Sequence, residues 1–202
     1  MAGAAVAAVT ERVGIRAGSV VAPLQDPLRI AEEWSVVDNI SGGRAAVSFA
    51  SGWHPHDFVL NPPGYNSRQE DVIAAMKTVR QLWRGEPVTR VNGLGKEIPV
   101  RVYPPPVQRE PPMWLTSAGS TDTFRLAGEM GAGVLTHLVK QGVDVLAENI
   151  AVYREAFRTT ACWRRPGGQC ARTSPDLSVC SAPGTPRRGT RSPGCHRSGE
   201  SG

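Results

Sequence analysis

The segment from Ser48 to His56, SFASGWHPH, holds the side chains with the clearest chemical potential. Trp53 offers a flat apolar wall, and His54 and His56 carry imidazole rings, which can take part in proton transfer. The segment follows a strand-like run, and loops at the carboxyl ends of parallel strands are where α/β folds contact ligands. We expect a small-molecule site here, and a surface loop around a packed tryptophan is the alternative.

A second candidate is the segment TSAGS, from Thr116 to Ser120, where small hydroxyl residues and a glycine precede an expected helix. Backbone N–H groups at a helix N-terminus bind phosphate, so we expect a phosphate site, and ordinary helix capping by Ser120 is compatible with it. His137 closes the next expected strand and projects at the same edge of the sheet. It is a candidate for proton transfer, with hydrogen-bonded architecture as the alternative.

Other patterns argue against metal, hydrolytic and dinucleotide chemistry. His54 and His56 lack a third ligand at a recognisable spacing, and no Gly-x-Ser-x-Gly elbow is present, so we expect neither a metal site nor a serine hydrolase. The glycines of 128–133 follow a helix and precede a strand, the reverse of the dinucleotide fingerprint. No Cys-x-x-Cys spacing, which a zinc site would need, occurs among Cys162, Cys170, Cys180 and Cys195.

These candidate residues need a scaffold, and the apolar patterns supply one. Strand-like and helix-like runs alternate four times, which predicts a parallel sheet with right-handed crossovers and an α/β fold class. The expected strands are 13–24, 44–50, 113–117 and 133–138, and the expected helices are 27–41, 67–85, 120–130 and 146–157. Residues 88–109 read as an inserted β-hairpin about Asn92 and Gly93.

Local signals place the helix starts. Asp26 followed by Pro27 is a strong N-cap with proline at the first helical position. Ser67 and Glu70 have the spacing of a capping box, which predicts a helix beginning at Ser67. The small apolar residues 1–9 lack a basic region and lead directly into the first strand, so we expect no signal peptide and a cytoplasmic protein.

The chain divides in composition after Arg158. Residues 1–158 hold 16 basic and 16 acidic side chains, so the net charge of +5 and all four cysteines fall in residues 159–202. That tail is rich in Arg, Pro, Gly and Ser, with Leu177 and Val179 as its sizeable aliphatic residues. We expect it to be disordered and hypothesise a frameshift near position 159. Trp163 is the aromatic residue that accompanies the arginines of the tail, which favours a solvated chain over nucleic-acid binding. The sequence also has no apolar run of about 18 residues that could span a membrane.

Long blocks of the first 158 residues resemble the bacterial luciferase-like, flavin-dependent monooxygenases. They include DPLRIAEEWSVVDNISGGR (26–44), SFASGWHPHDF (48–58), YNSRQEDVIAAMKTVRQLWRGE (65–86), PPMWLTSAGSTDTFRLAGEMGAGVLTHL (111–138) and ENIAVYREAFR (148–158). The similarity is greatest to the subgroup associated with polyketide and nonribosomal peptide pathways. It implies a (β/α)8 barrel, reduced FMN as cofactor, molecular oxygen as co-substrate, a separate flavin reductase, and a small-molecule or carrier-protein-tethered substrate.

The resemblance also implies roles for particular residues. Ser48, Ala50, Ser51 and Trp53 would border the flavin ring, with Tyr65 and Arg68 in a Tyr-x-x-Arg block beside it. Ser117, Gly119 and Ser120 would face the phosphate. Gly18, Ser19 and Val20 occupy the strand end where the family often has a cis non-prolyl peptide bond under the flavin. His54 and His137 become the candidates for proton transfer.

The chain departs from a complete barrel, which needs roughly 250 residues. Four of eight β/α units are expected in 1–158, and by family comparison the chain begins near the end of the second helix. An open sheet of this kind exposes strand edges and an apolar inner face, which favours oligomerisation. Two alternatives are a deazaflavin-dependent barrel oxidoreductase that transfers hydride, and a non-catalytic product of a truncated or misread gene.

Overall fold

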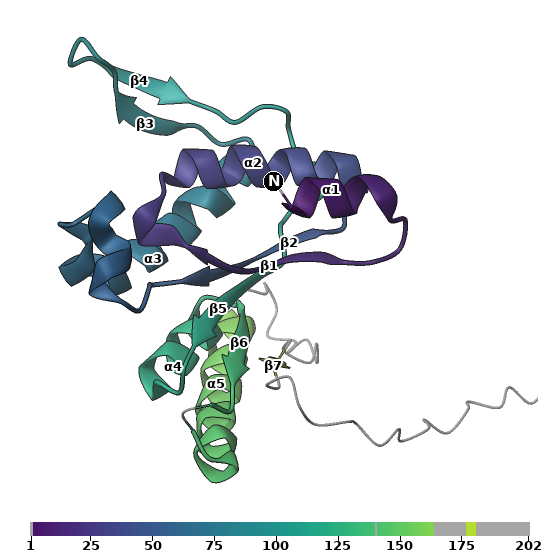
Figure 1. Cartoon of the computed structure of the whole chain (residues 1–202), viewed down its shortest axis with the longest axis vertical. Coiled ribbons are helices and arrows are strands. Elements are labelled where there is room, and N and C mark those ends of the chain that lie inside the picture. The colour runs from purple at the N-terminus through teal and green to yellow at the C-terminus, as the bar shows by residue number, and fades with distance from the viewer. Residues whose placement is uncertain (1, 140, 164–176, 181–202) are drawn as a thin grey trace, which may run out of the picture.

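The computed structural model describes residues 2–139, 141–163 and 177–180. Its main sheet is parallel, with strand order β1-β2-β5-β6-β7 (Figure 1). These strands are β1 (Ile15–Val21), β2 (Ala45–Ala50), β5 (Met113–Ser117), β6 (Gly133–His137) and β7 (Leu177–Cys180). The helices between them are α2 (Pro27–Ser41), α3 (Gly64–Trp83), α4 (Thr121–Glu129) and α5 (Val143–Trp163). The predicted α/β class with a parallel sheet is confirmed.

The register of the strands decides which side chains face the helices. Val47 lies beside Met113 and Leu115 beside Val134, while Ser48 lies beside Trp114 on the opposite face. The first set packs in the hydrophobic core against Met76 of α3 and other helical residues. α2 runs along β1 and β2, and α4 and α5 lie beside β5 and β6 (Figure 1). The helices thus cover one face of the sheet.

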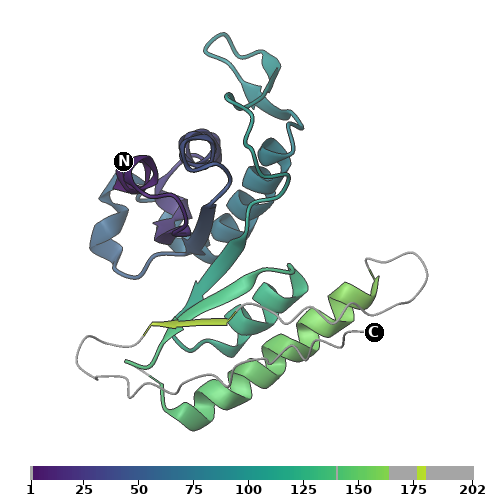
Figure 2. The same ribbon diagram turned by 90° about the vertical axis from the view of Figure 1, so that its right-hand side faces the viewer.

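The predicted hairpin forms between β3 (Val88–Val91) and β4 (Glu97–Val100), in antiparallel register. Asn92 shapes its turn, because its side-chain oxygen accepts hydrogen bonds from the N–H groups of Leu94 (2.9 Å) and Lys96 (3.0 Å). The hairpin projects away from the sheet and its helices (Figure 2). It is therefore an insertion that leaves the alternation of strands and helices intact.

The cap at the start of α2 also forms as predicted. The Leu28 N–H donates to Asp26 Oδ1 at 2.8 Å, and Pro27 occupies the first helical position. At the other end Gly42 adopts a φ of 63°, a left-handed conformation that glycine adopts without a steric penalty. These two signals fix both ends of α2.

The predicted capping box at Ser67 is wrong, because α3 begins three residues earlier, at Gly64. Pro63 stands at the N-cap with helical angles, φ −62° and ψ −33°, so the chain is already wound before Ser67. The Ser67 hydroxyl donates instead to Asp71 Oδ2, one turn further on, at 2.7 Å. Two short 3-10 helices, η1 (Ala22–Leu24) and η2 (Pro55–Leu60), precede α2 and α3.

The N-terminal residues form a helix, α1 (Ala2–Val9), that the sequence reasoning did not predict. Alanine is the strongest helix former, and five of these eight residues are alanine. The guanidinium of Arg44 donates to the carbonyl oxygens of Ala7 (3.2 Å), Thr10 (2.5 Å) and Val13 (2.6 Å). Arg44, which is distant from α1 in the sequence, therefore donates hydrogen bonds to carbonyl groups at the end of this helix and just beyond it.

Two stretches after residue 158 are described as regular structure, and the expected disorder of the tail stays a prediction. α5 continues to Trp163, and β7 pairs with β6 so that Leu177 lies beside Val134 and Val179 beside Thr136. Leu177 and Val179 are the two sizeable aliphatic residues of the tail, and their spacing of two suits a strand with one apolar face. Residues 164–176 and 181–202 lie outside the described residues. Within the described residues the main sheet has five parallel strands.

Candidate functional site

A hollow of about 500 Å³ lies at the carboxyl ends of β2, β5 and β6. It gathers predicted site residues from segments far apart in the sequence: Ala50, Ser51, Trp53, Arg68, Ser117, Ser120 and His137. Val21, Gly52, Asp57, Gln69, Thr116, Ala118 and Thr123 complete its lining. The structure therefore brings both sequence candidates, the loop after β2 and the loop before α4, to one place.

Trp53 forms an aromatic wall at this hollow. Its ring is nearly parallel to the ring of His137, with centroids 6.4 Å apart and an angle of 7°. It is also nearly parallel to the ring of His54, at 6.3 Å and 14°. His137 lines the hollow, whereas His54 is exposed and lies outside the lining. Trp53 is 53% exposed and forms part of the lining of the hollow.

The turn that carries Trp53 depends on Gly52. Its φ is +88°, and a Cβ at this position would lie 2.8 Å from Phe58 Cε2 and 3.1 Å from Val21 Cγ1. Phe58 is buried in η2 and packs edge-on against Tyr65, with ring centroids 5.1 Å apart. Glycine thus lets the loop lie directly on a packed aromatic pair.

Tyr65 and Arg68, from the first turns of α3, act as a pair. The Arg68 guanidinium lies over the Tyr65 ring, 4.4 Å from its centroid, and Nη1 donates to the Tyr65 carbonyl oxygen at 2.7 Å. Arg68 reaches the hollow, while Tyr65 stands behind it as a support. The neighbouring Gln69 donates to Ser51 Oγ at 3.2 Å and ties α3 to the loop after β2.

The loop before α4 is fixed by its own hydroxyl groups. Ser120 is the N-cap, whose Oγ accepts from the Thr123 N–H at 3.5 Å, and Ser117 Oγ accepts from the Gly119 N–H at 3.2 Å. Gly119 has a φ of +122°, in the left-handed region that favours glycine. The start of α4, with its positive dipole end, therefore opens at the hollow.

α5 and the segment before it support this loop from behind. Asn149 is 1% exposed; its Nδ2 donates to the Gly119 carbonyl at 3.1 Å, and its Oδ1 accepts from Thr121 at 2.7 Å. Gln141 Nε2 donates to Thr136 Oγ1 and to the His137 carbonyl, both at 2.8 Å. The sequence analysis predicted a role for neither side chain. Nothing near Asn149 in the sequence indicates a partner about 30 residues away, and nothing near Gln141 indicates one five residues away.

Three hydroxyl groups from three adjacent strands meet beside the hollow. Thr116 Oγ1 is 2.5 Å from Ser19 Oγ and 2.7 Å from Ser48 Oγ, and Ser19 donates to Ser48 at 3.4 Å. The cis peptide bond that the resemblance implied lies between Gly18 and Ser19. Thr116, which the sequence reasoning included only within the phosphate segment, joins the other two. Successive side chains of a strand point to opposite faces of the sheet, so Thr116 lies on the face opposite to Met113, Leu115 and Ser117. This alternation could have predicted that Thr116 shares a face with Ser48.

Six predicted residues are not part of the lining of the hollow: Ser19, Val20, Ser48, His54, Tyr65 and Gly119. Val20 packs against the core, in register with Phe49, and His54 is exposed. Within the described residues, no group of three or more His, Cys, Asp or Glu side chains could hold a metal ion. None of the helices in the described ranges is long and apolar enough to cross a membrane.

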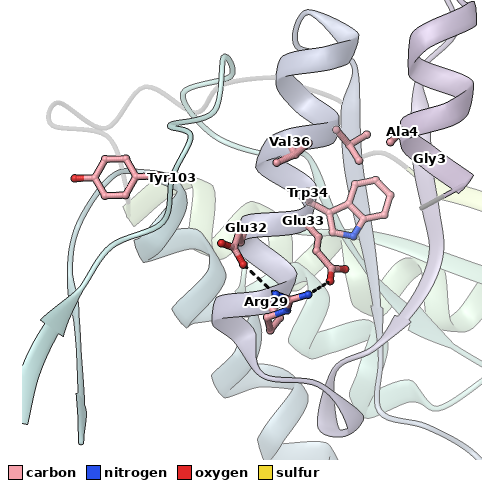
Figure 3. A pocket seen from close by; sticks show the side chains of 9 residues that line it. Gly3, Ala4, Arg29, Glu32, Glu33, Trp34, Val36 and Tyr103 are labelled. Carbon is pink, nitrogen blue, oxygen red and sulfur yellow. Dashed lines mark hydrogen bonds and ion pairs between the residues drawn. The ribbon is translucent and has the colours of Figure 1, made fainter. Parts of the chain in front are cut away.

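A second hollow, of about 390 Å³, lies between α1, α2 and the segment around Tyr103 (Figure 3). Its cation, Arg29, is paired with Glu32 at 3.4 Å and with Glu33 at 2.9 Å. None of the residues predicted to bind a ligand lines it. The hollow at the carboxyl ends of the strands is therefore the stronger candidate.

A parallel sheet with helices on one face and a hollow at the carboxyl ends of its strands is typical of an α/β protein of the barrel type. A family model described as luciferase-like monooxygenase matches residues 1–174, and the chain belongs to this family. The fold is a partial (β/α)8 barrel of the luciferase-like type.

The comparisons include solved structures and one characterised relative. The crystal structure of monooxygenase RslO1 from Streptomyces bottropensis aligns with a TM-score of 0.73 and 26% identity, over 88% of this chain and 52% of that one. The oxygenating constituent of 3,6-diketocamphane monooxygenase from Pseudomonas putida, in complex with FMN, has a TM-score of 0.67 and 20% identity, over 88% and 50%. At that identity the likeness shows the fold alone.

The oxygenase component of the flavin-dependent trigonelline monooxygenase of Acinetobacter baylyi is 30% identical over 159 residues, which are 74% of this chain and 42% of that protein. An uncharacterised protein of Mycobacterium tuberculosis is 29% identical over 65% of this chain and 47% of its own length. The chain thus spans about half the length of the curated relatives it matches.

Proposed function

We propose that the chain is the cofactor-binding part of a flavin-dependent monooxygenase that uses reduced FMN and molecular oxygen. The observation that carries this proposal is the hollow at the carboxyl ends of the strands, where a cation, a helix N-terminus and an aromatic wall converge. Family membership supports the same reaction class. The substrate we propose is a small-molecule or carrier-tethered intermediate of a polyketide or nonribosomal peptide pathway.

Part of the lining of the hollow fits a phosphate. Arg68 supplies a positive charge, Ser120 and Ser117 supply hydroxyl groups, and the first turn of α4 supplies backbone N–H groups. Gly119 has no side chain, and a Cβ at this position would lie only 3.2 Å from Gln141 Oε1. Oxygen-rich anions of this size are bound by such donor sets, so we propose that these groups bind the FMN phosphate.

Another part of the lining fits a flat ring. Trp53 presents an apolar face, and Ala50 and Ser51 leave room beside it. When bound, reduced FMN supplies the two electrons that activate oxygen for insertion into a substrate. The task of Trp53 is to hold the ring and to keep water away from it.

His137 is the group we propose for proton transfer. Its ring lines the hollow beside Trp53, at the carboxyl end of β6. His54 is the second candidate, and its ring is stacked nearly parallel to Trp53. In both cases the near-parallel stacking on the indole fixes the plane of the imidazole.

A separate flavin reductase is the electron source that we propose. The name of the Acinetobacter baylyi relative, an oxygenase component, describes a protein that works with such a partner. The glycines after α4 support this division of labour, because their helix–turn–strand order does not suit a dinucleotide.

The test compares FMN with riboflavin, which has the same ring but no phosphate. We expect Arg68→Gln and Ser120→Ala each to weaken FMN binding about tenfold and riboflavin binding less than twofold in calorimetric titrations, since a charge-assisted hydrogen bond contributes about 1.5 kcal/mol or more. Arg29→Gln, in the second hollow, is the matched control and should leave both affinities unchanged. Equal losses for FMN and riboflavin would contradict the proposed placement of the phosphate.

A further inference from the structure

Two polar side chains lie behind the loop before α4, and neither lines the hollow. Thr136, in β6, is 1% exposed, and Gln141, between β6 and α5, is half-buried. Thr136 contacts the backbone of Ser117, and Gln141 contacts the backbone of His137. Ser117 and His137 both line the hollow, so the two side chains stand one contact away from a ligand.

The chemistry of the groups fixes the direction of the hydrogen bonds that join them. The His137 carbonyl oxygen can only accept, so the Gln141 amide places its nitrogen there, at 2.8 Å. The second proton of the same nitrogen is donated to Thr136 Oγ1, also at 2.8 Å. Thr136 in turn donates its single proton to the Ser117 carbonyl oxygen at 2.8 Å. The bonds therefore run from Gln141 through Thr136 to Ser117.

The bond from Thr136 restrains a peptide group of the site. A peptide unit is planar, so holding the Ser117 carbonyl oxygen also restrains the N–H of Ala118, and both residues line the hollow. Ser117 Oγ accepts from the Gly119 N–H at 3.2 Å, which extends the restraint along the loop. Thr136 and Ser117 are almost fully buried, so water does not compete for the bond between them.

Gln141 also supports this loop by direct packing. A Cβ at Gly119 would lie 3.2 Å from Gln141 Oε1 and 3.5 Å from its Cβ and its Cδ. The side chain of Gln141 therefore packs against the backbone of Gly119. Gln141 Oε1 is buried and has no hydrogen-bond partner within the residues that the structure describes. The two donated bonds alone thus hold the amide in this orientation.

We propose that Thr136 and Gln141 are positioning residues that make the site prefer a phosphorylated flavin over the same flavin without its phosphate. Gln141 orients the Thr136 hydroxyl group, and Thr136 holds the Ser117 carbonyl group, so the loop before α4 keeps the shape that binds phosphate. The inference rests on the proposed function, in which this loop binds the FMN phosphate. It adds that the preference depends on two residues that touch no ligand.

The experiment measures the dissociation constants of riboflavin and FMN for the full chain, and their ratio is the readout. We expect Thr136→Val, which keeps the shape of the side chain but lacks the hydroxyl group, to lower this ratio about fivefold, because the buried Ser117 carbonyl loses its donor. Thr136→Ser, which keeps the hydroxyl group, should restore the ratio. Gln141→Ala should lower it about threefold. Both residues act on one bond, so the double variant should lose less than the product of the two single losses.

Gln81→Ala is the matched control, because Gln81 Nε2 also donates to a backbone carbonyl, that of Pro87 at 2.7 Å, but lies outside the lining of the hollow. It should keep the wild-type ratio. Retained riboflavin affinity shows in each variant that the rest of the site is folded. An unchanged ratio in Thr136→Val, or equal losses for the two flavins, would overturn the inference and leave the proposed function intact. A folded wild-type chain that binds neither flavin would overturn both.

Discussion

At the scale of the residue, the hollow is shaped by groups that hold the backbone in place as much as by groups that would touch a ligand. Gly52 lets the loop after β2 lie on Phe58, and Asn149 fixes the loop before α4 from the core side. Neither offers a functional group to the hollow. Their substitution should therefore disturb the site through its geometry.

Gly52→Ala tests this dependence on backbone. The new methyl group would meet Phe58 at 2.8 Å at a φ of +88°, so we expect a loss of about 2–3 kcal/mol in the free energy of unfolding, measured by urea denaturation. Gly85→Ala is the control, because its φ is +75° but nothing lies within 4 Å of its Cβ. It should lose about 1 kcal/mol. Equal losses in the two variants would show that the contact with Phe58 does not matter.

At the scale of the element, α4 and α5 form a close pair that positions the loop before α4. The N-terminus of α4 faces the hollow, and Asn149 of α5 holds the loop before it. The two helices approach at Gly128, where a Cβ would lie 2.6 Å from the Tyr153 carbonyl oxygen and 2.8 Å from Ala156 Cβ. The backbone of α5 leaves no room for a side chain at this position.

Gly128→Ala should therefore push the two helices apart. We expect a loss of about 2–4 kcal/mol in the free energy of unfolding, although alanine is the better helix former. Gly93→Ala, at a hairpin position with open space around it, is the control and should change stability by less than about 0.5 kcal/mol. A neutral or stabilising Gly128→Ala would mean that α4 and α5 are not packed in this way.

The elements also show how far sequence reasoning reaches. The Asp26 cap and the hairpin about Asn92 could be predicted, because each rests on residues adjacent in the chain. The start of α3 could not, since Pro63 winds the chain before the stronger-looking signal at Ser67. The role of Asn149 depends on a partner 30 residues away, a distance at which no local pattern operates.

The candidate site was predictable to a similar degree. The rule that ligands bind at the carboxyl ends of parallel strands placed Trp53, Ser120 and His137 together, and the structure gathers them in one hollow. The central position of Thr116 follows only once strand register is known, because its two partners belong to β1 and β2. Val20 was assigned to the site by its neighbours in sequence, whereas its side chain packs against the core.

At the scale of the whole molecule, the sheet is open within the described residues: β1 pairs only with β2, and β7 only with β6. Even so, the carboxyl ends of β2, β5 and β6 lie inside the sheet, flanked on both sides by a paired strand. Most of the strand residues that line the hollow therefore belong to interior strands, and Val21 of the edge strand β1 joins them. This is why we assign the chain a binding role although it covers about half of its relatives' length.

Hydrogen–deuterium exchange of the full chain with and without FMN tests that central claim most directly. Binding should protect residues 50–54, 65–69 and 116–123, the three segments that line the hollow, and should leave the hairpin at 88–100 unchanged. Protection confined to α1 and the first turns of α2, around the second hollow, would contradict the account. So would the absence of any change in a folded chain at saturating FMN.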